Sequence, residues 1–146
     1  MIVDRRELDA AMAAADKSPG DVEAQIAAAW ANDAFGSEAD AMRYYDAAFA
    51  LGVPSEKRSR FMVGYGSTMR NNNRIDDSIA VHRQAIADYP DFAAHHAFLA
   101  LALHRAGEHD EAMAEALTAL IDAGAANLGG YDRSLGYYRD ILAHTA

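Results

Sequence analysis

The chain has 146 residues, a net charge of −9 and no cysteine, so it is long enough for one domain with a hydrophobic core but has no disulfide or thiolate metal site. Its acidic balance disfavours nucleic acid and anionic membranes as main partners. The N-terminus carries charges where a signal peptide needs an apolar run, and no stretch approaches the roughly 20 apolar residues of a membrane span, so we expect a soluble cytoplasmic protein.

The first helix is expected to begin after Asp4 and to end near residue 16. Asp4 and Glu7 have the spacing of a capping box, which satisfies backbone N–H groups at a helix start. Residues 17–20 end this helix. Ser18 is predicted to cap the next helix, with Pro19 in its first turn, where a missing N–H costs nothing. The first helix is either the second half of an incomplete repeat or an unrelated N-terminal helix.

The following helices are expected to form antiparallel pairs. A helix at residues 21–35 ends at Gly36, which is predicted to be a left-handed C-cap. Asn71, Asn72 and Asn73 form a later turn, because asparagine also tolerates the left-handed conformation. The remaining helices are expected at residues 37–51, 55–70, 76–88, 92–105, 108–123 and 131–143.

Two stretches, residues 64–90 and 98–124, repeat each other at an interval of 34. Small residues and turn residues coincide in Gly66/Ala100, Ser78/Ala112, Ala85/Ala119, Asn73/Gly107 and Pro90/Gly124. The spacing from Ala41 to Ser78 is 37, so we place three extra residues in the loop at 52–55. A period in the thirties that contains two helices predicts a helical-hairpin repeat array.

These positions resemble the tetratricopeptide repeat, which has small residues at positions 8, 20 and 27, a turn former at 15 and proline near 32. The whole chain is similar to a group of small stand-alone bacterial proteins, tetratricopeptide repeat group five, through stretches such as AFGSEADAMRYYDAAFALGV and YDRSLGYYRDIL. The resemblance implies an all-α fold, a right-handed superhelical array of about three repeats plus terminal helices. It further implies an unassigned function, no cofactor and a homodimer. We expect one domain, 1–146, divided into an N-terminal helix at 1–18, repeats at 19–54, 55–91 and 92–124, and a capping helix at 130–144.

The resemblance also implies a concave groove lined by the first helix of each repeat. The groove positions that we single out are Ile26, Trp30, Arg60, Val63, Ser67, Arg70, Asn71, Leu101, His104 and Arg105. Arginine and tryptophan are frequent interface anchors, and arginine binds carboxylates, so an acidic segment is a candidate ligand. The alternative is that two of these arginines lie at helix ends only because cations are favoured there. The lysine and asparagine that clamp a peptide carboxylate in some members are replaced here by Ile26 and Trp30.

Catalytic and metal sites have weak support in the sequence. Ser67 and His104 are predicted to occupy neighbouring groove positions, but no strained nucleophile turn or oxyanion donor accompanies them. His95, His96, His104 and His109 include no pair at i, i+4 spacing, so we predict no metal site. No glycine-rich loop follows a strand, which disfavours nucleotide binding.

The closing helix carries an apolar stripe formed by Tyr131, Leu135, Tyr138 and Leu142. We predict that this stripe contacts a second copy in a symmetric homodimer. The alternative is that the stripe covers the third repeat within one chain. The sequence as a whole predicts a non-enzymatic interaction module that binds a peptide or helix, with a hydrolase or metal site using Ser67 and His104 as the alternative.

Overall fold

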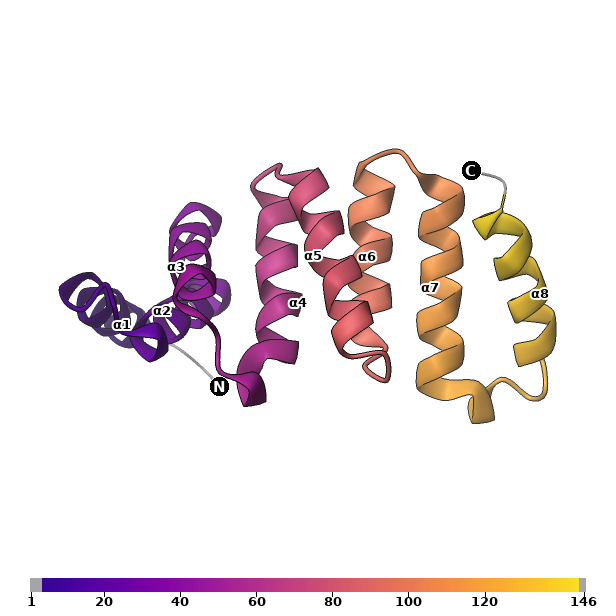
Figure 1. The fold of residues 1–146 in the computed structure, drawn as a ribbon, viewed down its shortest axis with the longest axis horizontal. Helices are drawn as coiled ribbons and strands as arrows, with labels where there is room; N and C mark the ends of the chain where they lie inside the picture. Colours follow the sequence, from indigo (N-terminus) through magenta and orange to yellow (C-terminus); the bar gives the residue numbers. More distant parts are fainter. Residues whose placement is uncertain (1–3, 145–146) are drawn as a thin grey trace. The chain divides into compact units, whose positions relative to one another are not determined.

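The computed structural model describes residues 4–144, and these residues form α-helices and one 3₁₀ helix without a strand (Figure 1). The fold class is therefore all-α, as predicted. Every helix among the described residues is too short or too polar to cross a membrane. The chain divides between Asn73 and Arg74 into two compact units, each of which we describe by itself. The handedness of the array and the single-domain organisation stay predictions.

The first unit contains four helices: α1 (Arg5–Lys17), α2 (Val22–Phe35), α3 (Glu38–Leu51) and α4 (Ser55–Asn71). Helix α1 packs on α2, α2 packs on α3, and α4 packs on both α3 and α2. Tyr45 of α3 is fully buried, and its ring meets Phe61 of α4 edge to face at a centroid distance of 5.1 Å. Aromatic side chains therefore fill the space between α3 and α4.

The second unit contains α5 (Ile75–Asp88), α6 (Ala94–Arg105), α7 (His109–Gly124), a 3₁₀ turn at Ala125–Asn127 and α8 (Asp132–Ala143). Helices α5 and α7 pack on α6, and α8 packs on α7. Leu99, Leu103 and Ala112 form the core, and the half-buried Ile79 and Ile86 of α5 pack against it. The small side chain of Ala112 lets α6 and α7 approach closely, as its repeat position predicts.

Side-chain capping defines the starts of α1, α2 and α3. The capping box at α1 is confirmed, since the Glu7 N–H donates to Asp4 Oδ1 at 2.9 Å and the Asp4 N–H donates to Glu7 Oε2 at 3.1 Å. The prediction for α2 is wrong: Asp21, not Ser18, is its N-cap and accepts from the Glu23 and Ala24 N–H groups. One carboxylate satisfies two backbone donors there, which displaces the start of the helix beyond Pro19.

The turn residues after the helices differ in conformation. Asn73 is left-handed, with a φ of 62°, as predicted for the asparagine turn, and Gly107 is also left-handed, with a φ of 85°. Gly36 is not left-handed, because its φ is −97°. A Cβ at Gly36 would instead lie 2.8 Å from Asn32 Cγ and 3.0 Å from Asn32 Cα. Gly36 is therefore favoured because Asn32 of α2 leaves no space for a Cβ, and not because the backbone is left-handed.

The two units repeat one arrangement at an offset of 71 residues, the sum of the predicted spacings of 37 and 34. Helices α1, α2 and α3 begin at residues 5, 22 and 38, and α5, α6 and α7 begin at 75, 94 and 109. The fourth place is held by α4 in the first unit and by α8 in the second. Helix α1 therefore corresponds in position to α5, which favours the interpretation of α1 as the second half of an incomplete repeat.

Candidate interaction site

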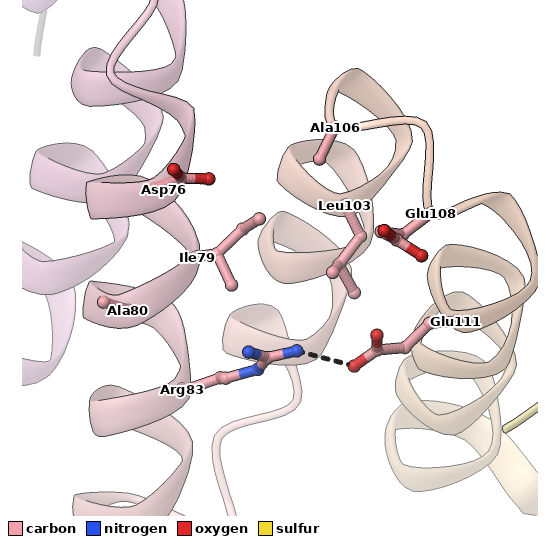
Figure 2. A pocket seen from close by; sticks show the side chains of 8 residues that line it. All are labelled: Asp76, Ile79, Ala80, Arg83, Leu103, Ala106, Glu108 and Glu111. Carbon is pink, nitrogen blue, oxygen red and sulfur yellow. Dashed lines mark hydrogen bonds and ion pairs between the residues drawn. The ribbon is translucent and has the colours of Figure 1, made fainter. Parts of the chain in front are cut away.

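The second unit contains an open pocket of about 550 Å³, which we call the acidic pocket (Figure 2). Helix α5 forms one wall, the end of α6 forms the floor, and the start of α7 forms the opposite wall. The lining consists of an apolar group and a charged group: Ile79, Ala80, Leu103 and Ala106, and Asp76, Arg83, Glu108 and Glu111.

The turn between α6 and α7 shapes the floor of the acidic pocket. The left-handed Gly107 lets the chain reverse direction, and the Glu108 N–H then donates to the Leu103 carbonyl oxygen at 2.9 Å. This 6→1 hydrogen bond is typical of a helix that ends in a Schellman motif. It places Glu108 at the rim, directly before α7, while the buried Leu103 closes the bottom of the pocket.

Charges of opposite sign face each other across the acidic pocket. Figure 2 shows Arg83 reaching from α5 toward α7, where its Nη2 lies 2.8 Å from Glu111 Oε1. Asp76, in the first turn of α5, and Glu108 add two exposed carboxylates. The described lining thus contains three carboxylates and one guanidinium, so its formal charge is −2.

The first unit contains a corresponding but smaller pocket of about 290 Å³. Eight of its lining residues lie 71 positions before the eight that line the acidic pocket: Arg5, Leu8, Asp9, Met12, Asn32, Phe35, Ser37 and Asp40. Asp9 and Phe35 stand where the acidic pocket has Ala80 and Ala106. Larger side chains at these two positions explain why the first pocket is smaller.

The predicted groove residues of the first unit differ in accessibility. Ile26 is only 1% exposed and belongs to the core, so we leave it out of any ligand surface. Trp30 and Val63 are half-buried, and Arg60 is exposed. At the end of α4, Arg70 Nη2 donates to Ser67 Oγ at 3.2 Å and to Asn71 Oδ1 at 3.5 Å. The structure therefore brings Ser67, Arg70 and Asn71 together.

The predicted groove residues of the second unit are exposed, and two of them share a second surface. Leu101 and His104 line a groove of about 400 Å³ between α6 and α7, which we call the α6–α7 groove, while Arg105 lies outside it. Its lining consists of Ala100, Leu101, His104, His109, Ala112, Met113 and Ala116. His104 and His109 lie at one end, with their Nδ1 atoms 3.0 Å apart.

A polar cluster lies next to the core of the first unit. Tyr45 Oη and Thr68 Oγ1 both donate to the Asp33 carboxylate, the latter at 3.2 Å. Asp33 keeps an exposed edge, but its carboxylate faces α3 and α4. Burial raises the pKa of Asp33 above its ordinary value, and the hydrogen bonds from Tyr45 and Thr68 oppose this rise. Burial also raises the pKa of Tyr45, together with the negative charge of Asp33.

The predicted contact stripe of the closing helix is divided between two environments. Leu135 and Leu142 are half-buried, whereas Tyr131 and Tyr138 are exposed. Tyr137 and Ile141 are also exposed. Helix α8 therefore presents an outward apolar face in addition to the face that packs on α7.

The histidines show how the tertiary structure changes a pattern read along the chain. His104 and His109 are not at i, i+4 spacing, yet the α6–α7 turn places them side by side. His95 is buried, which lowers its pKa, and His96 Nδ1 lies 2.5 Å from Glu115 Oε2. Among residues 4–144, no group of three or more histidine, cysteine or acidic side chains could hold a metal ion.

None of the predicted site residues lines the acidic pocket. The prediction placed binding on the first helix of each repeat, whereas this pocket lies mainly between the second helices, α5 and α7. Comparison of residues 71 positions apart could have found it, because Ala80 and Ala106 are small where the first unit has Asp9 and Phe35.

The family model described as Tetratrico peptide repeat matches residues 22–142. The chain belongs to this family. Neither a curated protein nor a solved structure matches the chain. Tetratricopeptide repeats in general are protein–protein interaction modules, so the two pockets and the α6–α7 groove are best considered as surfaces for protein partners.

Proposed function

We propose that this tetratricopeptide repeat protein binds a segment of another protein without catalysing a reaction, and that the acidic pocket takes an arginine side chain of that segment. The observation that carries the proposal is an apolar floor between carboxylates on two helices. Asp76 extends from α5, and Glu108 stands before α7 on the opposite side (Figure 2).

Arginine suits this pocket better than lysine does. Its planar guanidinium can donate to carboxylates on both walls, whereas the lysine ammonium is a compact, strongly hydrated charge. The aliphatic part of the arginine would pack on Ile79 and Leu103. Because exposed ion pairs each contribute only about 0–1 kcal/mol, one arginine binds weakly, and the rest of the segment must supply further contacts.

The test is an NMR titration of the full chain with N-acetyl-arginine amide, compared with the lysine and glutamine amides. We expect saturable shifts at the backbone amides of Ala80, Ala106 and Glu108 that are largest for arginine and weaken as salt rises. The double variant Asp76→Asn/Glu108→Gln should lose the response. Asp122→Asn removes an exposed charge of α7 outside the pocket and should keep it.

A second variant fills the acidic pocket without changing its charge. Ala106→Phe introduces the side chain that the first unit carries at the corresponding position, Phe35. Shifts that persist in Ala106→Phe, or that glutamine amide produces equally well, would show that arginine does not bind in this pocket.

The alternative hypothesis, a hydrolase site that uses Ser67 and His104, gains no support from the contacts of the described residues. Ser67 Oγ accepts a hydrogen bond from Arg70, and His104 lies against His109. Neither arrangement couples a hydroxyl to a general base. The interaction module is therefore the function that the geometry supports best.

Two further parts of the proposal concern other surfaces. We propose self-association through the outward face of α8, supported by the exposed Tyr137, Tyr138 and Ile141. An acidic partner segment remains a prediction for the arginines of the expected concave groove. Arg60 and Arg105 are exposed, which is compatible with that prediction.

A further inference from the structure

We propose that the α6–α7 groove accepts an amphipathic α-helix of a partner protein, at the place where α4 packs in the first unit. The groove shares no lining residue with the acidic pocket, so this inference stands apart from the arginine site. Its basis is a difference between two units that otherwise repeat one arrangement.

In the first unit, α4 covers the surface that corresponds to the groove. It packs on both α2 and α3, where Tyr45 is fully buried against Phe61 of α4 and Met42 is 8% exposed. The corresponding residues of α7, 71 positions later, are Met113 and Ala116. Met113 is 53% exposed and Ala116 is also exposed, so this part of the repeat lacks a covering helix.

The path of α8 accounts for the difference. Helix α8 occupies the fourth place of the second unit, but it packs against α7 (Figure 1). No residue of α8 lines the groove. Leu101 of α6 therefore remains 48% exposed on the open side. A helix seated there would bury Leu101 and Met113 together, which is the usual way in which a groove binds the apolar face of a partner helix.

The packing of α4 indicates which helix would fit. Within α4, Gly64 faces α3, because an added Cβ there would lie only 2.9 Å from Cζ of Tyr45. The groove has Ala116 in place of Tyr45, so a phenol ring is missing from its floor. An occupant should therefore carry a large apolar side chain where α4 has glycine, because the total volume in a packed interface is conserved.

The probe for this proposal is a fluorescent peptide with the sequence of residues 55–71 in which Gly64 is replaced. We compare Gly64→Leu with Gly64→Ala, because leucine and alanine have similar helix propensities and differ in the volume that they place in the groove. Anisotropy with the full chain should show binding of the leucine peptide that is at least about tenfold tighter than that of the alanine peptide, a difference that can be resolved in the dissociation constant.

Variants of the protein locate the binding. Leu101→Glu and Met113→Glu should each abolish capture of the leucine peptide. Leu120→Glu is the matched control, since Leu120 lies on α7, is 47% exposed and does not line the groove. Equal affinity of the two peptides, or unchanged binding to Leu101→Glu, would overturn the proposal.

A second copy of the chain is the competing occupant. If the groove is closed by self-association, Leu101→Glu will convert a dimer to a monomer on a sizing column with light scattering, and the leucine peptide will dissociate the wild-type dimer. That result would overturn the proposal that a partner helix occupies the groove and would show that a second copy of the chain occupies it. A wild-type oligomeric state unchanged by Leu101→Glu, together with capture of the leucine peptide, supports the partner helix.

Discussion

Replacing Gly64 by alanine should destabilise the first unit, although alanine is the better helix former. Gly64 lies within α4, and a Cβ at this position would overlap Tyr45 Oη and lie 2.9 Å from Cζ of Tyr45 and 3.3 Å from Asp33 Oδ2. Tyr45 is fully buried between α3 and α4, so its ring cannot move away without disturbing the core.

Opposing contributions determine the size of the effect. Alanine gains roughly 0.8–1.0 kcal/mol over glycine in a helix interior. Overpacking a filled core costs about 1–3 kcal/mol, and displacing the Tyr45 hydroxyl from the Asp33 carboxylate costs about 1.5–3 kcal/mol more. We therefore expect Gly64→Ala to lower the free energy of unfolding by about 2–4 kcal/mol.

Urea unfolding followed by circular dichroism measures this change, and a double-mutant cycle identifies its cause. In a Tyr45→Phe background the obstructing oxygen is absent and only the 2.9 Å contact with Cζ remains, so Gly64→Ala should cost about 1.5–3 kcal/mol less than in wild type, because no hydroxyl is displaced from Asp33. Gly136→Ala in α8 is the control, because its Cβ would meet only Arg139 Nη2, at 3.6 Å. A Gly64→Ala protein as stable as wild type, or an equal cost in both backgrounds, would refute the reasoning.

Two further predictions concern pH and assembly. Because burial raises the pKa of Asp33 above its ordinary value of 3.8, the folded state binds this proton more tightly than the unfolded state does, so the contribution of Asp33 to stability falls as pH rises from below 3.8 through the folded pKa. Over this pH range wild type should therefore lose stability relative to Asp33→Asn. A difference in unfolding free energy between the two proteins that does not change with pH would contradict the assignment. Light scattering behind a sizing column should give a mass near twice 15.7 kDa, shifted toward the monomer by Tyr138→Glu. A wild-type monomer at tens of micromolar would contradict the dimer.

Local sequence determined where most helices lie. The capping box of Asp4 and Glu7, the left-handed Asn73 and the left-handed Gly107 each act over a few residues, so their chemistry is readable without knowing the fold. The spacings of 34 and 37 residues also indicated paired helices, because an apolar face and small contact residues must recur wherever the same packing recurs.

Some local predictions were wrong because neighbouring residues compete for the same role. Both Ser18 and Asp21 can cap α2, and the choice depends on which side chain the turn at Pro19 directs toward the free N–H groups. Gly36 has the residue type of a left-handed cap, but its backbone instead accommodates the approach of Asn32. Ile26 has a groove position in the repeat, yet packing in the first unit buries it.

The candidate surfaces were decided by tertiary structure. The acidic pocket depends on α5, α6 and α7 meeting around Ala80 and Ala106, three segments whose separation along the chain hides their proximity. The α6–α7 groove depends on α8 packing against α7 and leaving Leu101 and Met113 exposed. The sequence by itself determined which segments become helices and at what interval they recur, because those properties arise from short-range hydrogen bonding and periodicity. Which of their faces remain open was decided only when the helices packed, because exposure depends on contacts between residues far apart in the sequence.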